Sequence, residues 1–243
     1  VTSHMDKMAA WCFYVPPEAL MQGVLVGKEG KRLCAEDLYG GKQGDFIATK
    51  GGGYGYLIVD SKTFQEAKSH LKDQCAAFQK LAMMPMLQFG RKKAASFEEL
   101  AKKIGVPAED LVATMKQYNE IAGSGQPDPL GKIPKRFVPQ DTPPFYAMDI
   151  SFMGFSSTFT KGGIPTAAIT LGGLVVNEKT GEVVNKDGSS IAGLYAAGRN
   201  AVGLCSNGYF ASGTSIADCI FAGRRAGRHA ASIPSKPLES VLA

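Results

Sequence analysis

Apolar residues spaced three or four positions apart predict helices in four parts of the chain. The stretch 61–82 has this spacing, and so do 96–105, 107–123 and 215–231. On a helix the spacing places apolar side chains on one face, which then packs against a core. In the third stretch this face consists of Leu111, Met115, Tyr118 and either Ile121 or Ala122.

The two central helices have clear end signals. Ser96 is followed by Glu99, the spacing of a capping box that satisfies two free backbone N–H groups. Gly105 ends this helix. Pro107 lies in the first turn of the next helix, where its missing N–H costs nothing. These signals predict a helix pair.

Short apolar runs predict the strands. Residues 23–37 have the pattern of a strand, a glycine-containing turn and a second strand, and Tyr56–Val59 form a further strand. In the C-terminal part, two short apolar runs predict a β-hairpin with its turn near Thr180 and Gly181. A loop at 186–190 and a short buried strand at 193–197 follow.

Two stretches favour loops. The residues from Asp37 onward form a glycine-rich loop that leads into the strand at 56–59. The stretch 123–148 is rich in proline and glycine, but its aromatic residues favour an ordered surface loop over a linker. Helices and strands together indicate an α/β protein.

Composition narrows the class of protein. The chain has 243 residues, 44% of them hydrophobic, which suits one large or two modest domains. The net charge of +5 comes from scattered basic residues, which favours solvated faces over a nucleic-acid surface. No apolar run is long enough to span a membrane, and no signal peptide opens the chain.

Cysteine and histidine usage indicates the compartment and argues against a metal site. The five cysteines have no paired spacing, which favours a reduced cytoplasmic protein. The three histidines lie far apart in the sequence, so no metal site is expected.

The stretch "GLYAAGRNAVGLCSNGYFASGTSIADCIFAGRRAG" (193–227) combines a strand, a loop and a helix made of small residues. Gly198 permits close approach by another group, and either Thr214 or Ser215 can cap the helix. The N–H groups at a helix start favour an anion or an electron-rich carbonyl, such as that of a reduced flavin ring. From the residues alone, a helix–sheet contact without a ligand is an equal alternative.

This stretch resembles the C-terminal flavin-binding segment of the fumarate reductase/3-ketosteroid dehydrogenase superfamily of FAD enzymes. Other stretches match in order: "GVLVGKEGKRLCAEDLYGG" is similar to the entry into the cap domain, and "SFEELAKKIGVPAEDLVATMKQYNEIAGSGQPD" to its helix pair. "PPFYAM" and "TLGGLVVNEKTGEVV" resemble the return into the FAD domain. The steroid-active branch is the more similar, because "NGYFASGTS" lacks the arginine of the dicarboxylate branch.

The resemblance implies the C-terminal part of a Rossmann-like FAD/NAD(P)-binding domain plus an α+β cap domain. We expect the cap at 23–150, FAD-domain pieces at 1–22 and 151–236, and a tail at 237–243. The family's N-terminal G-x-G-x-x-G, which holds the FAD pyrophosphate, is not matched by "GKEGKR" or "GGGYG". The chain is therefore expected to be the C-terminal half of a flavoenzyme: a piece, a cleavage product or one of two chains, with the N-terminal FAD-binding half on a separate chain or fragment.

The resemblance also implies roles for individual residues. Tyr209 and the backbone N–H of Gly213 would polarise a substrate carbonyl, Tyr39 would transfer a proton, and Ser212 is a second hydroxyl candidate. The residues expected to contact FAD are Gly198, Arg199, Thr214, Ser215 and Ile216. Without the resemblance, Tyr209 reads as a packed loop aromatic and Tyr39 as an exposed turn tyrosine.

These roles predict a dehydrogenase that acts on a steroid-like or other apolar carbonyl substrate, with hydride transfer to flavin N5. Two alternatives stay open. One is a flavin-dependent alkene reductase of the same superfamily. The other is a catalytically silent binding module, because the glycine loop is absent.

Overall fold

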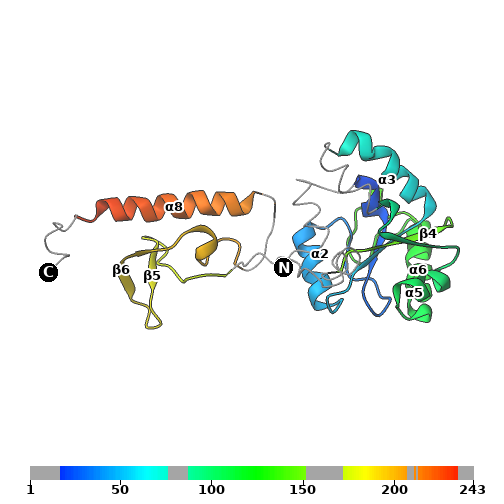
Figure 1. The fold of residues 1–243 in the computed structure, drawn as a ribbon, viewed down its shortest axis with the longest axis horizontal. Helices are drawn as coiled ribbons and strands as arrows, with labels where there is room; N and C mark the ends of the chain where they lie inside the picture. The colour runs from blue at the N-terminus through cyan, green and yellow to red at the C-terminus, as the bar shows by residue number, and fades with distance from the viewer. Residues whose placement is uncertain (1–16, 76–86, 152–171, 207–210, 212, 235–243) are drawn as a thin grey trace. The chain divides into compact units, whose positions relative to one another are not determined.

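The computed structural model describes residues 17–75, 87–151, 172–206, 211 and 213–234 (Figure 1). The chain divides into two compact units, residues 1–168 and 169–243. Each unit is described by itself below. The chain is a mixed α/β protein, as its pattern of apolar residues predicts.

The first unit is built on a four-stranded antiparallel sheet with the order β1-β2-β4-β3. The strands are β1 (Val24–Val26), β2 (Tyr56–Val59), β4 (Phe145–Asp149) and β3 (Arg91–Ala94). Its two central strands, β2 and β4, are buried over almost their whole length. This sheet is the framework on which the rest of the unit packs.

Helices cover both faces of this sheet, because alternate residues of a strand point to opposite sides. Leu57 and Met148 belong to a core with the 3₁₀ helix η1 (Glu18–Gln22), α2 (Gly40–Thr49) and α3 (Ser61–Gln74). Ile58 and Ala147 belong to a second core with α5 (Phe97–Ile104) and α6 (Ala108–Ser124). A short 3₁₀ turn, η2 (Pro134–Arg136), precedes β4.

The predicted helix pair is confirmed. The hydroxyl of Ser96 accepts from the N–H of Glu99 at 3.2 Å, and the Glu99 carboxylate accepts from the N–H of Ala95 at 2.9 Å. Gly105 ends α5 in the left-handed region, with φ 73°. Pro107 is the N-cap of α6, one residue before the first turn in which it was expected.

Two predictions for this unit are wrong, and a third is confirmed only in part. Residues 40–49 form helix α2 and not a glycine-rich loop, because Gln43 and Ile47 bury one face of the helix and this packing outweighs the low helix propensity of glycine. The second strand expected within 23–37 is reduced to one bridge between Val26 and Arg32. The expected surface loop 123–148 ends in the central strand β4.

The second unit contains β5 (Glu182–Val184), β6 (Ser190–Tyr195), the 3₁₀ turn η3 (Gly198–Asn200) and α8 (Thr214–Ser232). The predicted C-terminal helix is confirmed. The strand predicted to be buried is instead β6, which is largely exposed because β5 is its only partner among the described strands. The described core of this unit is small: Val183, Ala196 and Ala201, with Val176 and Ile191 beside them.

Candidate functional site

The residues predicted to form the site lie in different parts of the chain. Tyr39 belongs to the first unit, whereas Gly198, Arg199 and residues 213–216 belong to the second. Tyr209 and Ser212 lie outside the described residues. The two parts of the candidate site are therefore described separately.

Among the described residues, no side chain covers the glycine at the start of α8. Gly213 is its N-cap, with φ 88° in the left-handed region, and no described atom lies within 4 Å of where a Cβ would stand. Neither Thr214 nor Ser215 caps the helix as predicted, and the Thr214 hydroxyl instead donates to the carbonyl of Ala211 at 2.7 Å. The first turn contains no acidic residue, and Asp218 in the second turn has its carboxylate bonded to the N–H of Leu204.

The loop that precedes α8 lies directly against the helix. A Cβ at Gly198, whose φ is 60°, would lie 2.7 Å from Sγ of Cys219. The N–H of Leu204 donates to the carboxylate of Asp218 at 3.3 Å. The close approach that Gly198 permits is thus an approach to α8 itself, and it fixes this loop beside the first two turns of the helix.

Arg199 and Ile216 differ in exposure. Arg199 lies in η3 and is half-buried. Ile216 is 67% exposed on the first turn of α8. An exposed glycine and an exposed apolar side chain at a helix start fit the edge of a flat, electron-rich ring such as that of a flavin. The N–H of Thr214 donates to the carbonyl of Ala211 at 3.3 Å.

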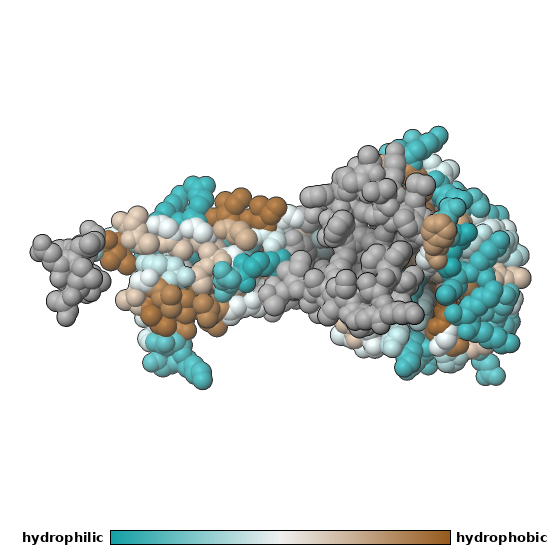
Figure 2. Space-filling model, in the orientation of Figure 1, coloured by the Kyte–Doolittle hydropathy of each residue, from teal (hydrophilic) through white to brown (hydrophobic). Residues whose placement is uncertain are grey.

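The exposed apolar surface of the second unit extends beyond this helix start. Along α8 only Ala222 and Ala226 are buried, while Ile216, Ile220 and Phe221 are each more than half exposed. Figure 2 shows hydrophobic surface over the first turns of α8. Exposed apolar patches of this kind mark surfaces that bind another polypeptide or a ligand.

Tyr39, the candidate proton-transfer residue, is the N-cap of α2 and is 38% exposed. Its backbone carbonyl accepts from the N–H groups of Lys42 and Gln43, at 2.8 and 3.2 Å. Tyr39 therefore lies at a helix start with its carbonyl bonded, whereas the sequence predicted a glycine-rich loop.

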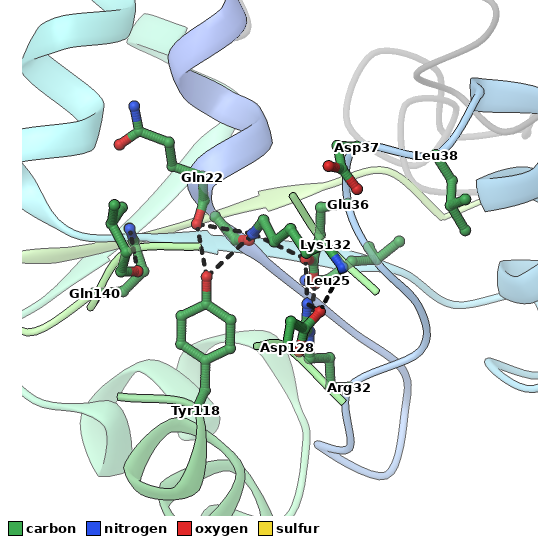
Figure 3. Close-up of polar contacts among 12 residues, drawn as sticks. Gln22, Leu25, Arg32, Glu36, Asp37, Leu38, Tyr118, Asp128, Lys132 and Gln140 are labelled. Atoms are coloured by element: carbon green, nitrogen blue, oxygen red, sulfur yellow. Dashed lines mark hydrogen bonds and ion pairs between the residues drawn. The ribbon is translucent and has the colours of Figure 1, made fainter. Parts of the chain in front are cut away.

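The segment before Tyr39 is held by a buried ionic network that the sequence analysis missed (Figure 3). Arg32 bonds Glu36 through Nε and Nη2, at 2.9 and 2.8 Å, and Asp128 through Nη1 and Nη2, at 2.6 and 2.9 Å. Lys132 lies 2.9 Å from Glu36 and donates to the carbonyls of Gln22 and Gly23. Each charge has an opposite partner, as buried charges require.

The network shifts the pKa values of its members. Burial alone would lower the pKa of Arg32, but the hydrogen bonds to Glu36 and Asp128 raise it. Burial would raise the pKa of Asp128, yet the hydrogen bond from Arg32 holds it below its usual value. Burial lowers the pKa of Lys132 against the opposing effect of Glu36. The four-residue spacing of Arg32 and Glu36 was the available sequence signal, but Lys132 comes from a distant loop.

Among the described residues, no group of three histidine, cysteine, aspartate or glutamate side chains is placed to hold a metal ion. No helix in the described part of the chain is long and apolar enough to cross a membrane.

Comparison with known proteins places these features in context. The family described as an FAD binding domain matches residues 21–216. A 3-oxo-5-alpha-steroid 4-dehydrogenase of Comamonas testosteroni is 32% identical over 203 residues, 82% of this chain and 36% of that protein. A probable fumarate reductase of Shewanella frigidimarina is 28% identical over 209 residues, 86% of this chain and 31% of that protein.

A solved structure is also similar. The 3-ketosteroid-delta4-(5alpha)-dehydrogenase of Rhodococcus jostii RHA1, in complex with 4-androstene-3,17-dione, matches with a TM-score of 0.69 and 32% identity. The match covers 89% of this chain and 40% of that one. The chain thus spans 36% of the length of the first of these relatives and 40% of the solved structure.

Proposed function

We propose a function for this chain on the premise that it belongs to the FAD binding domain family, within the fumarate reductase/3-ketosteroid dehydrogenase superfamily. Its relatives are FAD-dependent dehydrogenases and reductases. We propose that the chain supplies the cap and the C-terminal FAD-domain segment of a dehydrogenase that desaturates a carbonyl-activated C–C bond of a ketosteroid-like substrate.

The observation that carries this proposal is the start of α8. It combines an open left-handed glycine, a first turn without acidic residues and the exposed side chain of Ile216. We assign FAD contacts to Arg199 and the first turn, Thr214–Ile216, and a supporting role to Gly198. Because Gly198 is packed against Cys219, its contribution is to place the loop and not to face the ring.

The proposed chemistry divides among a few groups. When bound, FAD supplies a hydride acceptor at N5. The backbone N–H of Gly213 and the hydroxyl of Tyr209 donate hydrogen bonds to the substrate carbonyl and stabilise the charge that develops on its oxygen. Tyr39 takes the proton from the carbon beside that carbonyl, and Ser212 is a second hydroxyl candidate.

We propose that residues 23–150 form the cap, and that 1–22 and 151–236 belong to the FAD domain, followed by a tail. The family's glycine loop is absent, and the relatives are longer by more than a factor of two. A polypeptide that carries this loop would cover the apolar side of α8 formed by Ile216, Ile220 and Phe221.

The steroid-like substrate is supported by the two steroid dehydrogenases, each 32% identical to this chain. An alkene reductase of the same superfamily is the second candidate, favoured by the similarity to the probable fumarate reductase. The lack of arginine and histidine in residues 207–215 favours an apolar carbonyl over a dicarboxylate. A silent binding module is the third candidate, because the glycine loop is absent.

The experiment that tests this proposal uses the longest natural form of the protein that contains this chain. We expect it to hold FAD and to reduce an artificial electron acceptor when given a 3-oxo-5α-steroid. Activity only in the direction of alkene reduction would favour the second candidate. A colourless protein that binds neither FAD nor steroid would support the silent module.

A further inference from the structure

One buried side chain of α2 contacts the backbone on the N-terminal side of Tyr39. Gln43 is 4% exposed, and its Nε2 donates to the carbonyls of Glu36 and Leu38, at 3.0 and 2.7 Å. Both amide protons are therefore used on the turn that leads into the helix. The backbone N–H of the same residue donates to the carbonyl of Tyr39 at 3.2 Å.

The other end of this turn is fixed by the ionic network. The Glu36 carboxylate accepts from the N–H of Leu25 in β1 at 2.9 Å as well as from Arg32 and Lys132. The carboxylate of Asp37 accepts from the N–H of Ile133 at 2.9 Å. The backbone from residue 36 to residue 39 is thus attached to the sheet on one side and to Gln43 on the other.

Helix α2 needs this attachment. It begins with two glycines, which have the lowest helix propensity after proline, and Tyr39 makes no side-chain cap to it. The carboxamide of Gln43 joins the turn to the helix, in addition to the backbone N–H groups of Lys42 and Gln43 that donate to the carbonyl of Tyr39. Without it, the turn at residues 36–38 loses two hydrogen bonds to α2, and the backbone at Tyr39 is expected to shift.

We propose that Gln43 is a positioning residue for Tyr39: its amide bonds to the carbonyls of residues 36 and 38 set where the phenol of Tyr39 lies. The inference rests on the proposed role of Tyr39 in proton transfer. A proton acceptor must lie within hydrogen-bond reach of the carbon acid, and a displacement of about 1 Å lowers kcat by up to about a hundredfold.

The chain contains a matched control in Gln140. This residue is also a buried glutamine of the first unit, 0% exposed, and it accepts from the N–H of Asp60 at 3.0 Å. It has no contact with residues 36–39 among the described interactions. Gln43→Met and Gln140→Met each replace a buried amide by an unbranched side chain of similar size without donors.

The test measures the position of Tyr39 directly, by NMR of the 243-residue chain labelled with ¹³C at Cζ of its 8 tyrosines. Tyr39→Phe identifies the Tyr39 resonance. We expect Gln43→Met to shift or broaden this resonance, while Gln140→Met leaves it in place although it lowers the melting temperature. If Gln43→Met does not fold, Gln43→Asn keeps the amide but shortens its reach, and the same shift is expected.

An unchanged Tyr39 resonance in a folded Gln43 variant would overturn the inference. Turnover measurements distinguish a failure of this inference from a failure of the proposed function. In the longest natural form, Tyr39→Phe should abolish turnover, and Gln43→Met should lower kcat by about tenfold or more with little change in KM. Full turnover by Tyr39→Phe would refute the role of Tyr39, whereas the NMR result would still decide whether Gln43 positions it.

Discussion

The ammonium group of Lys132 lies 2.9 Å from the carboxylate of Glu36, and both side chains are almost completely excluded from solvent. The two residues belong to segments 96 positions apart in the chain, so their contact joins the turn before Tyr39 to the loop after α6.

Lys132→Met should strongly destabilise the first unit. Removal of one partner of a buried ion pair costs about 3–5 kcal/mol, because the other charge is left undercompensated. Arg32 still faces Glu36, so a loss near 3 kcal/mol is expected in urea unfolding.

Lys135→Met is the control for Lys132→Met. Lys135 is 81% exposed and lies 4.0 Å from Glu18, so its loss should cost under about 1 kcal/mol. An equal loss of unfolding free energy in the two variants would show that the buried network does not stabilise the first unit.

The stability of the first unit should fall in acid. The hydrogen bond from Arg32 lowers the pKa of Asp128 in the folded state, so the carboxylate stabilises the fold above its unfolded pKa of about 4. This contribution is lost as the pH falls through the lower folded value. Asp128→Asn should be less stable at pH 7. Its free energy of unfolding, measured with urea from pH 7 to pH 3, should fall less steeply than that of the parent chain. An Asn variant with an unchanged slope would contradict the assignment.

Gly198→Ala should destabilise the second unit. Alanine is strained at φ 60°, and its Cβ would lie 2.7 Å from Sγ of Cys219, so a loss of about 1–3 kcal/mol is expected. Gly223→Ala is the matched control, because it lies within α8 with open space around it and should be neutral or stabilising by up to about 1 kcal/mol. Thermal unfolding followed by circular dichroism compares the two, and a neutral Gly198→Ala would show that the loop does not pack closely on the helix.

Thiol labelling should distinguish buried Cys34 from exposed Cys219. Burial raises the pKa of the Cys34 thiol to about 12, so at pH 8 it is protonated as well as inaccessible. Cys219 is exposed on α8 and should react with iodoacetamide in the native chain. Peptide mass spectrometry after a short exposure should find Cys219 modified and Cys34 intact. Rapid labelling of Cys34 would mean that the region around Glu36 opens readily.

The sequence predicted the elements whose signals are local. The caps at Ser96 and Gly105, the strand at 56–59 and the C-terminal helix all depend on residues within a few positions of one another. The sequence did not predict helix α2. This helix depends on the burial of Gln43 and on its bonds to carbonyls before the helix, and neither can be read from a glycine-rich stretch.

The candidate site, too, was predicted where the signal is local in sequence and missed where it depends on contacts between distant segments. The sequence predicted a helix that starts near Ser215, and α8 starts at Thr214. The roles of Gly213 and its neighbours came from the resemblance and stay predictions. Lys132 was not found, because nothing near it in sequence indicates that it is buried beside Glu36. The proposed role of Tyr39 came from the resemblance alone, and only its backbone surroundings come from the fold.

The central claim is that the first turn of α8 binds the flavin, and a pair of variants at Ile216 tests it most directly. Ile216→Asp and Ile216→Asn have nearly the same shape at this exposed position, and a carboxylate in the first turn favours the helix itself. FAD binding is measured by titration of the longest natural form of the protein. The account predicts that the Asp variant binds FAD about tenfold more weakly than the Asn variant, because its charge faces the electron-rich edge of the ring. Equal affinities in two folded variants, or no FAD binding by the parent protein, would contradict it.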